Sequence, residues 1–196
     1  MQPRTALLDM ARIDPLLCKG CGNCVVACPG KAITTPLDSD EQMLAQISAT
    51  LAAANGERRP RVLVFGCQWS GHAAAELAGA RGLQYPADIR LIPVRCSARF
   101  DPLHILWAFL NGAAGVFLGA CPPGECHYLD GNRYAEERIA TLQEMLAQHG
   151  FDVRRLRLKW IKPDDPGAFV ELISDFAAFI AALEGVSHTC YLMPVA

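Results

Sequence analysis

Four cysteines near the N-terminus follow the spacing C-x2-C-x2-C-x3-C-P. They are Cys18, Cys21, Cys24 and Cys28, and Pro29 comes directly after them. Three thiolates two residues apart can wrap a loop around one face of a 4Fe-4S cube, and the intervening glycines let the backbone approach the sulfurs. Zinc sites usually use two separated C-x2-C pairs, and redox C-x-x-C motifs use one pair. The spacing therefore predicts a 4Fe-4S cluster bound by these four cysteines.

The role of the fourth cysteine in this run has three alternatives. In two-cluster ferredoxins the fourth cysteine of each run ligates the other cluster, and this chain has a single run. Cys28 either closes the local cluster, helps to bind a cluster in a partner, or is replaced by Cys190 near the C-terminus. The simpler interpretation of Cys190 is a small unligated residue near a chain end.

A second group of cysteines is spread through the sequence. Its members are Cys67, Cys96, Cys121 and Cys126. Each of the first three ends a predicted strand, and the carboxyl ends of parallel strands share one edge of a sheet, where open α/β sheets bind ligands. Cys126 joins Cys121 through a C-x4-C segment that contains two prolines. These thiols are therefore expected to converge.

The chemistry of the second group has three interpretations. Four convergent thiolates suit a 2Fe-2S cluster or a structural zinc, whereas isolated cysteines are often buried simply as small apolar residues. Three strand-end positions and a Pro/Gly-rich C-x4-C segment favour a site over packing. The neighbouring ferredoxin run favours iron, because a second redox centre gives the first one somewhere to send electrons.

The elements that must position these cysteines alternate along the chain. Strands are expected at 62–65, 89–94, 116–118 and 156–161, and helices at about 39–54, 72–80, 102–110, 133–148 and 166–184. Ser39 with Gln42 resembles a capping box, and Asp101-Pro102 and Asp165-Pro166 are typical helix starts. Alternating βα units predict an α/β fold with a short parallel sheet and flanking helices, flavodoxin- or Rossmann-like, preceded by a small ferredoxin-like iron-sulfur module.

Three segments follow from this pattern. Residues 1–36 are expected to form the ferredoxin-like 4Fe-4S module, residues 37–60 a linker helix, and residues 61–196 the α/β domain with the second cysteine site. The total of 196 residues suits one sizeable domain with a small appendage.

Composition excludes several classes of protein. Hydrophobic residues make up 52% of the chain and the formal net charge is -2, which argues against long disorder and against a broad basic face for nucleic acid. Nine cysteines without the apolar core of a signal peptide favour a reducing, cytoplasmic location. The uncharged segment 105–124 has the length of a membrane span, but Asn111-Gly112 predicts a helix that stops there and a strand after it. No other run is expected to be long enough to span a membrane.

The motifs of common enzymes are missing from the sequence. No G-x-G-x-x-G follows a strand, there is no P-loop, and no Ser/His/Asp or Cys/His arrangement suggests a nucleophile. Two metal centres without an evident substrate pocket predict a non-catalytic electron-transfer subunit. One rival is a zinc-stabilised protein-interaction module without a redox role, and another is a thiol-based redox sensor.

The α/β part resembles the delta, iron-sulfur subunit of methyl-viologen-reducing hydrogenases over about residues 61–184. The resemblance is carried by FGCQW at 65–69, LAG at 77–79, LQYP at 83–86, VRCSARFDP at 94–102, GACPPGECHY at 119–128 and Gly131-Asn132. It implies a 2Fe-2S cluster bound by Cys67, Cys96, Cys121 and Cys126. It also implies relay of electrons between a hydrogenase or formate dehydrogenase and the flavin-containing component of heterodisulfide reductase.

The N-terminal part resembles the junction at which the last ferredoxin motif of that flavin-containing heterodisulfide reductase component runs into such a delta domain. The similar residues are 18–34 and 39–47. The resemblance implies single-electron relay between a 4Fe-4S and a 2Fe-2S cluster within a larger flavin-containing oxidoreductase complex. The missing half of the ferredoxin unit would then lie on a partner chain.

One departure from the family concerns the segment after Trp69. Ser70 stands where the family commonly has a further cysteine, and His72 stands where an aromatic is usual. Four cysteines remain, so a full ligand set survives. The difference argues against a fifth, exchanging thiol and suggests a branch that serves a different reductase.

Several other residues have alternative roles. His127 could donate a hydrogen bond to a cluster sulfide, although Rieske-type ligation needs two histidines. His72 and His104 are expected to be surface or capping residues at helix starts. Arg95 and Arg99 either offset the negative charge of a cluster or are solvated, and the aromatic residues Trp69 and Tyr128 either shield the cluster from water or belong to the core.

Overall fold

The strands form one parallel sheet in the order β2-β1-β3-β4. The computed structural model describes residues 13–52 and 62–184. The strands are β1 (Val62–Cys67), β2 (Ile89–Val94), β3 (Gly115–Ala120) and β4 (Leu156–Trp160). The helices are α1 (Asn23–Ala27), α2 (Asp40–Leu51), α3 (Gly71–Ala80), α4 (Pro102–Leu110), α5 (Gly131–Gln148) and α6 (Pro166–Glu184), with 3-10 turns η1 (Ser97–Arg99) and η2 (Val153–Arg155).

The chain builds the sheet outward in both directions from β1. This strand pairs in parallel with β2 on one side and with β3 on the other. This is the beginning of the flavodoxin-like strand order, in which the ligand crevice lies where the chain changes direction, between β1 and β3. The predicted α/β fold with a short parallel sheet is confirmed.

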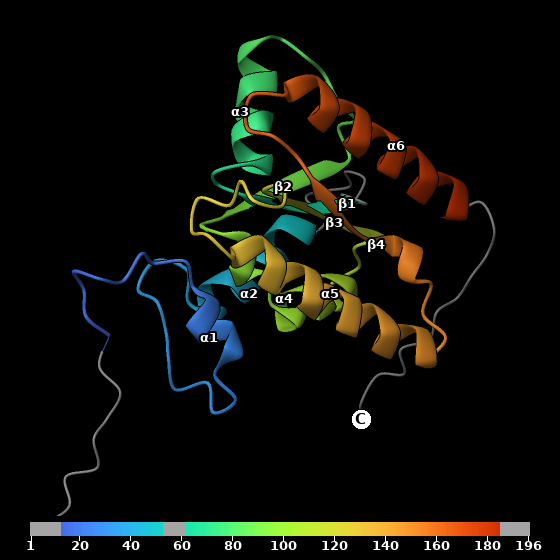
Figure 1. Ribbon diagram of the computed structural model, residues 1–196. Helices are drawn as coiled ribbons and strands as arrows, with labels where there is room; N and C mark the ends of the chain where they lie inside the picture. The colour runs from blue at the N-terminus through green and yellow to red at the C-terminus, as the bar shows by residue number, and fades with distance from the viewer. Residues whose placement is uncertain (1–12, 53–61, 185–196) are drawn as a thin grey trace, which may run out of the picture.

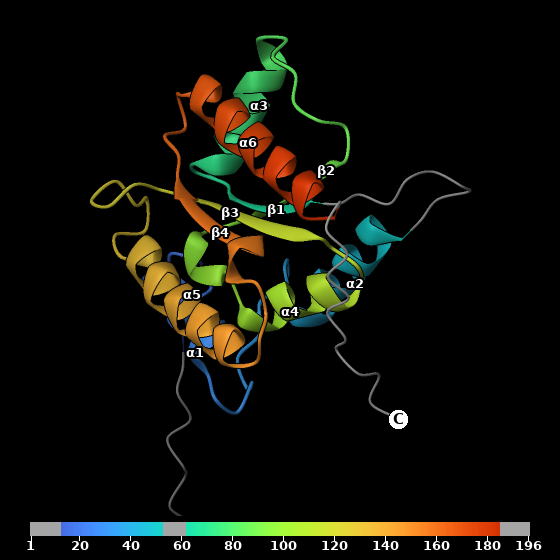
Figure 2. The same cartoon turned by 90° about the vertical axis from the view of Figure 1, so that its right-hand side faces the viewer.

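The sheet is the middle of three layers. Helices α3 and α6 cover one face, and α2, α4 and α5 cover the other, as the two views in Figure 1 and Figure 2 show. Alternate residues of β1 supply the two cores: Leu63 and Phe65 pack toward α2, α4 and α5, whereas Val62 and Val64 pack toward α3 and α6. Every residue of β1 is buried, as expected for a central parallel strand.

The helix starts follow the predicted capping chemistry. Ser39 accepts a hydrogen bond from the Gln42 backbone N–H, and the Gln42 side chain accepts one from the Ser39 backbone N–H, so the capping box is confirmed. Asp101 caps α4 by accepting from the Leu103 N–H, and Asp165 accepts from the Ala168 N–H at the start of α6. The helix α5 begins at Gly131, two residues earlier than expected.

The helix expected as a linker is part of the core. Three residues on one face of α2, namely Met43, Ile47 and Leu51, are buried in the cluster formed with α4 and the sheet. On α4, the Trp107 indole N–H donates to the Ser48 hydroxyl of α2 at 2.9 Å. The linker helix is thereby fixed against the α/β layer. Residues 53–61, which include its expected C-terminal end, lie outside the described part of the chain.

Two apolar segments bear on membrane insertion. The segment 105–124 contains the end of α4, a turn at Asn111-Gly112 and the strand β3, as predicted. The expectation that no other run is long enough was wrong, because Pro166–Leu183 in α6 is long and apolar enough to cross a membrane, judged by length and composition alone. Two acidic residues, Glu171 and Asp175, interrupt this run, but its mean hydropathy remains as high as that of a membrane-spanning helix. One face of α6 packs in the core through Phe169, Ile173, Phe176 and Ile180, and the core helix of a water-soluble protein passes the same test.

Candidate functional site

The second cysteine group meets at the carboxyl edge of the sheet. Cys67 is the last residue of β1, Cys96 follows β2 by two residues, and Cys121 comes directly after β3. Cys126 lies in the loop between β3 and α5. All four side chains are buried and pack together in one cluster. The predicted convergence of these thiols is therefore confirmed.

The four thiols are arranged as two pairs. The Sγ atoms of Cys67 and Cys121 lie 3.8 Å apart. Cys96 and Cys126 face the start of α5, where a Cβ atom on Gly131 would lie 2.3 Å and 3.3 Å from their Sγ atoms. The pairs come from different elements: the first from the ends of the adjacent strands β1 and β3, the second from the loops after β2 and before α5.

The grouping of the sulfurs bears on which metal fits. A single zinc ion with Zn–S bonds of about 2.3 Å would hold four thiolates roughly 3.8 Å from one another. Within 13–52 and 62–184, the only group of three or more potential ligand atoms that all lie within 4.8 Å of each other is Asp40, Asp101 and His104. The cysteine sulfurs are thus more spread than a zinc tetrahedron. Two separated pairs suit a binuclear iron centre, in which each iron takes two thiolates.

The two thiols of the first pair, Cys67 and Cys121, have pKa values shifted in opposite directions. A hydrogen bond with Cys67 lowers the pKa of Cys121 to about 6, and the same hydrogen bond, together with burial, raises the pKa of Cys67. Of the two, Cys121 is the thiol that ionises more readily, and Cys67 is the one that keeps its proton. Burial, with smaller contributions from the nearby Cys126 and Cys21 thiols, raises the pKa of Cys96 to about 12. Buried thiols disfavour each other's ionisation because two negative charges would lie close together. A bound metal ion replaces their protons and offsets this negative charge.

The start of α5 supplies positive electrostatic potential to these sulfurs. An 18-residue helix carries a partial positive charge at its N-terminus, and Gly131 places this end directly against Cys96 and Cys126. The next residue, Asn132, donates hydrogen bonds to the backbone carbonyls of Cys121 at 3.1 Å and Pro122 at 2.7 Å. Asn132 thereby fixes the Pro-rich loop that joins the two pairs.

The N-terminal cysteine run lies in a loop around the short helix α1. Cys18 and Cys24 are exposed, and Cys21 and Cys28 are half-buried. Gly20 and Gly22 have φ angles of 73° and 79°, a left-handed conformation that glycine adopts without strain. Backbone N–H groups, with that of Ala32 contributing most, lower the pKa of Cys28. These N–H groups stabilise a Cys28 thiolate, as a ligand would require.

The two cysteine groups are neighbours in space. Cys21 packs against the buried cluster that contains the four cysteines of the second group together with Ala98. Asn23 of α1 is tied to α5, because its side-chain oxygen accepts a hydrogen bond from Arg138 at 2.9 Å. Arg138 also donates to the carbonyls of Ala98 and Phe100, next to Cys96. The ferredoxin segment is thus docked beside the edge that carries the second group.

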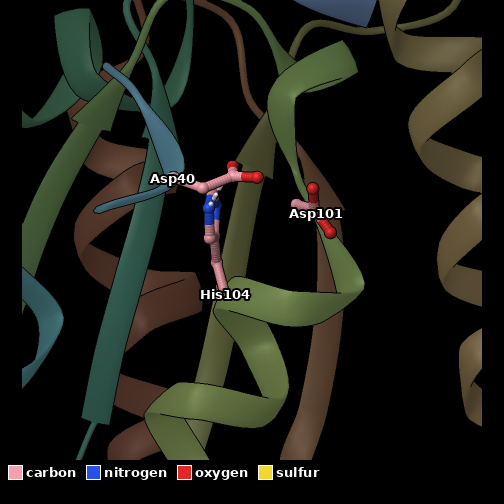
Figure 3. Close-up of side chains that lie close together, drawn as sticks. All are labelled: Asp40, Asp101 and His104. Carbon is pink, nitrogen blue, oxygen red and sulfur yellow. Dashed lines mark hydrogen bonds and ion pairs between the residues drawn. The ribbon is translucent and has the colours of Figure 1, made fainter. Parts of the chain in front are cut away.

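A cluster of charged side chains overturns the expectation for His104 and excludes one of the two alternatives for Arg99. His104 is buried rather than on the surface, and its Nε2 atom lies 3.1 Å from Asp40 Oδ1. Figure 3 shows the His104 ring pointing toward Asp40, with Asp101 on the same helix start. Arg99 is fully buried rather than solvated, and it donates to Asp40 at 2.6 Å and to the Asp38 carbonyl at 2.9 Å. Both side chains are buried because helix α2 packs over them and brings Asp40 as a partner.

The same cluster resembles a metal site but is filled by cations of the protein. Lys31 donates to Asp101 at 3.0 Å and lies 3.7 Å from Asp40. The Arg99 guanidinium lies between the same two carboxylates. Two carboxylates neutralised by a lysine and an arginine have little charge left for a metal ion. The cluster instead joins the ferredoxin segment, α2, η1 and α4.

The surface near the second group carries aromatic side chains. Trp69 is 41% exposed and stacks on His127 with ring centroids 3.6 Å apart. Tyr128 packs against the cysteine group, and its hydroxyl accepts a hydrogen bond from the Trp69 indole at 3.3 Å. Tyr128 thus shields the sulfurs, whereas Trp69 lies at the surface. Ser70 is buried and donates to the Ile161 carbonyl at 2.7 Å.

Sequence reasoning did not identify all the residues that build the site. Gly131 was not recognised as a position of close approach, although a glycine at a helix start is a weak signal of one. Gly22 was expected to let the backbone approach the sulfurs, but its contact with Arg99 was not expected. The cluster of Asp40, Asp101 and Lys31 was also missed, because two of its contacts join distant segments: Arg99 and Asp40 are 59 residues apart, and Lys31 and Asp101 are 70 apart. Cys190 and His188 lie outside the described residues.

Comparisons with known proteins agree with this architecture. A family model described as methyl-viologen-reducing hydrogenase, delta subunit, matches residues 62–184. A second model, described as a 4Fe-4S binding domain, matches residues 11–34. The two matches cover the α/β part and the N-terminal cysteine run.

Curated relatives fall into two kinds. The A component of the ferredoxin:CoB-CoM heterodisulfide reductase of Methanosarcina mazei is 40% identical over 195 residues, which cover 85% of this chain and 24% of that protein. The iron-sulfur D component of the F420-non-reducing hydrogenase of Archaeoglobus profundus is 36% identical over 127 residues, covering 65% of this chain and 93% of that protein. The corresponding protein of the vhc hydrogenase of Methanococcus voltae is 39% identical over 124 residues, covering 63% and 86%. The chain spans about a quarter of the length of the heterodisulfide reductase relative and most of the length of the hydrogenase relatives.

Proposed function

The chain belongs to the family of the methyl-viologen-reducing hydrogenase delta subunit, and on this premise we propose that it relays single electrons between a 4Fe-4S and a 2Fe-2S cluster. Cys18, Cys21, Cys24 and Cys28 would bind the first cluster. Cys67, Cys96, Cys121 and Cys126 would bind the second. The observation that carries the proposal is the packing of Cys21 against the second, buried group, so that the two groups of cysteines lie side by side in one chain.

The geometry of the second group supports a binuclear iron centre over zinc. Its sulfurs lie as two pairs, one of them 3.8 Å apart, rather than as one compact tetrahedron. Iron-sulfur clusters supply a one-electron redox centre when bound. The residues around the site would tune such a cluster. The start of α5 would offset its negative charge, and Tyr128 and the sheet would exclude water from it. Burial and helix dipoles are among the factors that set a cluster's potential.

We extend the proposal to the partners of the chain. The relatives are named as parts of heterodisulfide reductases and of hydrogenases. This chain would accordingly work with a flavin-containing partner similar to the A component of heterodisulfide reductase, and with part of a hydrogenase, formate dehydrogenase or other reductase. A cytoplasmic location is part of the same proposal.

Metal and sulfide analysis of the chain tests the proposal. The chain is purified without oxygen, iron, zinc and acid-labile sulfide are measured per polypeptide, and the dithionite-reduced protein is studied by EPR. About six irons, four in one cluster and two in the other, are expected. About two irons would mean that the N-terminal cluster needs a ligand from a partner.

The two rival functions give different results in the same experiment. A zinc-stabilised interaction module would contain about one zinc and no iron, and it would be colourless. A thiol-based redox sensor would show reversible oxidation of cysteine pairs without stoichiometric iron. Either result would overturn the electron-relay proposal.

A further inference from the structure

We propose that Cys21, among the four cysteines of the N-terminal run, is the residue through which an electron crosses to the second group, and that Gly22 and Arg99 are the positioning residues that hold it there. This inference rests on the proposed function, because it takes two clusters in one chain as given. The crossing makes and breaks no bond. One electron leaves one centre, which is oxidised, and arrives at the other, which is reduced.

Contact with the second group distinguishes Cys21 from the other three cysteines. Cys18 and Cys24 are exposed, and Cys28 is half-buried at the far end of α1, where its sulfur faces the backbone N–H groups of residues 30–33. Of the run, Cys21 is the cysteine that packs against the buried second group. A thiolate ligand shares the electrons of its cluster, so the ligand in contact with the second group is the shortest route between the two centres.

The glycines on either side of Cys21 press the loop onto the segment that carries Cys96. A Cβ atom on Gly22 would lie 2.9 Å from Arg99 Cδ, and a Cβ atom on Gly20 would lie 3.2 Å from Arg95 Nη1. Arg95 and Arg99 flank Cys96 in the sequence. The backbone around Cys21 therefore rests on two arginines that move together with a ligand of the second group.

Arg99 is a rigid support for this contact. Its side chain is 0% exposed, and its guanidinium is held by Asp40 and by the Asp38 carbonyl. Its Cβ, Cγ and Cδ atoms all lie within 3.6 Å of the position that a Gly22 Cβ would take. Lys31, from the ferredoxin segment itself, completes the cluster by pairing with Asp101. The alkyl part of Arg99 supports the loop, and its charged end fixes Arg99 in place.

The substitution Gly22→Ala tests the inference without changing a ligand. The added methyl group would meet Arg99 and move Cys21 away from the second group. The matched control is Gly150→Ala, because Gly150 has a similar φ of 76° and an added Cβ there would meet nothing within 4 Å. The readouts are iron per chain, the magnetic interaction between the two reduced centres in EPR, and the rate of electron transfer between them after rapid reduction.

We expect Gly22→Ala to keep its iron, to lose most of the magnetic interaction and to slow transfer between the centres several-fold. Gly150→Ala should behave like the unmodified chain. Unchanged interaction and rate in Gly22→Ala, with six irons present, would overturn the inference alone. Absence of iron from the second group in the unmodified chain would overturn the proposed function, and this inference with it.

A second variant covers the case in which Gly22→Ala fails to bind its N-terminal cluster. Arg99→Lys keeps the positive charge but loses the planar, multiply bonded end that fixes the side chain. We expect the same weakening of the magnetic interaction with both clusters present. Hydrogen exchange of the backbone at residues 18–24 should also be faster than in the unmodified chain. If Arg99→Lys leaves interaction and exchange unchanged, Arg99 does not position Cys21.

Discussion

Gly131 and Cys96 are packed so closely that a Cβ atom on the glycine would lie 2.3 Å from the Cys96 Sγ atom. Non-bonded atoms do not approach to this distance, so only glycine is compatible with the first position of α5. The contact brings the positive end of the helix to a sulfur that is buried and, without a metal, hard to ionise. Position 131 therefore couples the fold to the metal-binding chemistry of the second group.

Replacement of Gly131 by alanine should remove the metal of the second group. In Gly131→Ala the methyl group would displace Cys96, and we expect about two irons fewer per chain, with the N-terminal cluster retained. Gly79→Ala in α3 is the control, because nothing lies within 4 Å of an added Cβ there. The control should keep its iron and gain up to about 1 kcal/mol of stability from better helix propensity. A full complement of iron in Gly131→Ala would contradict the prediction.

Single ligand substitutions should separate the two clusters. Cys121→Ser is expected to bleach the 2Fe-2S signal and leave the 4Fe-4S signal, because Cys121 belongs to the buried group at the sheet edge. Cys24→Ser, in the exposed N-terminal run, should do the reverse. Optical and EPR spectra of the reduced proteins check both variants. If both spectra survive in Cys121→Ser, the assignment of the second ligand set is wrong.

Much of the fold was predictable because its signals are local. The run of apolar residues in β1, the Ser39 capping box and the Asp-Pro helix starts each act within a few residues. The convergence of Cys67, Cys96 and Cys121 followed from topology, because parallel strands end at the same edge. Local patterns and strand direction together were enough to place the second cysteine group.

The contacts between the ferredoxin segment and the α/β layer could not be predicted in this way. Arg99 and His104 are residue types that usually lie at the surface. Their burial depends on Asp40, which is 59 residues from Arg99 and 64 residues from His104 in the sequence. The contact of Gly22 with Arg99 likewise joins two segments that are far apart in the sequence. No periodicity or motif within the sequence encodes which side chain covers which, since the contact is decided by how the layers pack.

Removal of the buried guanidinium should destabilise the chain strongly. In Arg99→Met the alkyl part is largely kept, but Asp40 and Asp101 lose a buried cationic partner. Loss of one partner of a buried ion pair costs about 3–5 kcal/mol. Arg154→Met is the control, since Arg154 pairs with Asp152 at the exposed surface, where loss of the pair should have little effect on stability. Anaerobic thermal unfolding compares the two, and equal midpoints would show that the Arg99 cluster does not stabilise the fold.

The buried histidine predicts a loss of stability in weak acid. Burial, together with the nearby Arg99 charge, lowers the pKa of His104 despite the opposing effect of Asp101 and Asp40. The folded chain therefore holds His104 neutral at a pH where the unfolded chain, with an ordinary histidine pKa of about 6.5, takes up a proton. Its contribution is fully present above about pH 6.5 and is lost as the pH falls toward the lowered folded-state pKa, with a slope of at most about 1.4 kcal/mol per pH unit.

The pH dependence assigned to His104 can be separated from that of the acidic groups. Burial raises the pKa of Asp40, but its hydrogen bond and ion pair with Arg99 outweigh this and lower it, so the Asp40 contribution is lost only in stronger acid, below about pH 4. Between pH 7.5 and 5 we expect the unfolding temperature of the unmodified chain to fall more steeply than that of His104→Gln. His149→Gln, at an exposed position, is the control and should keep the steep dependence. If the unfolding temperatures of the unmodified chain and of His104→Gln fall in parallel with pH, His104 is not the group responsible for the loss of stability in weak acid.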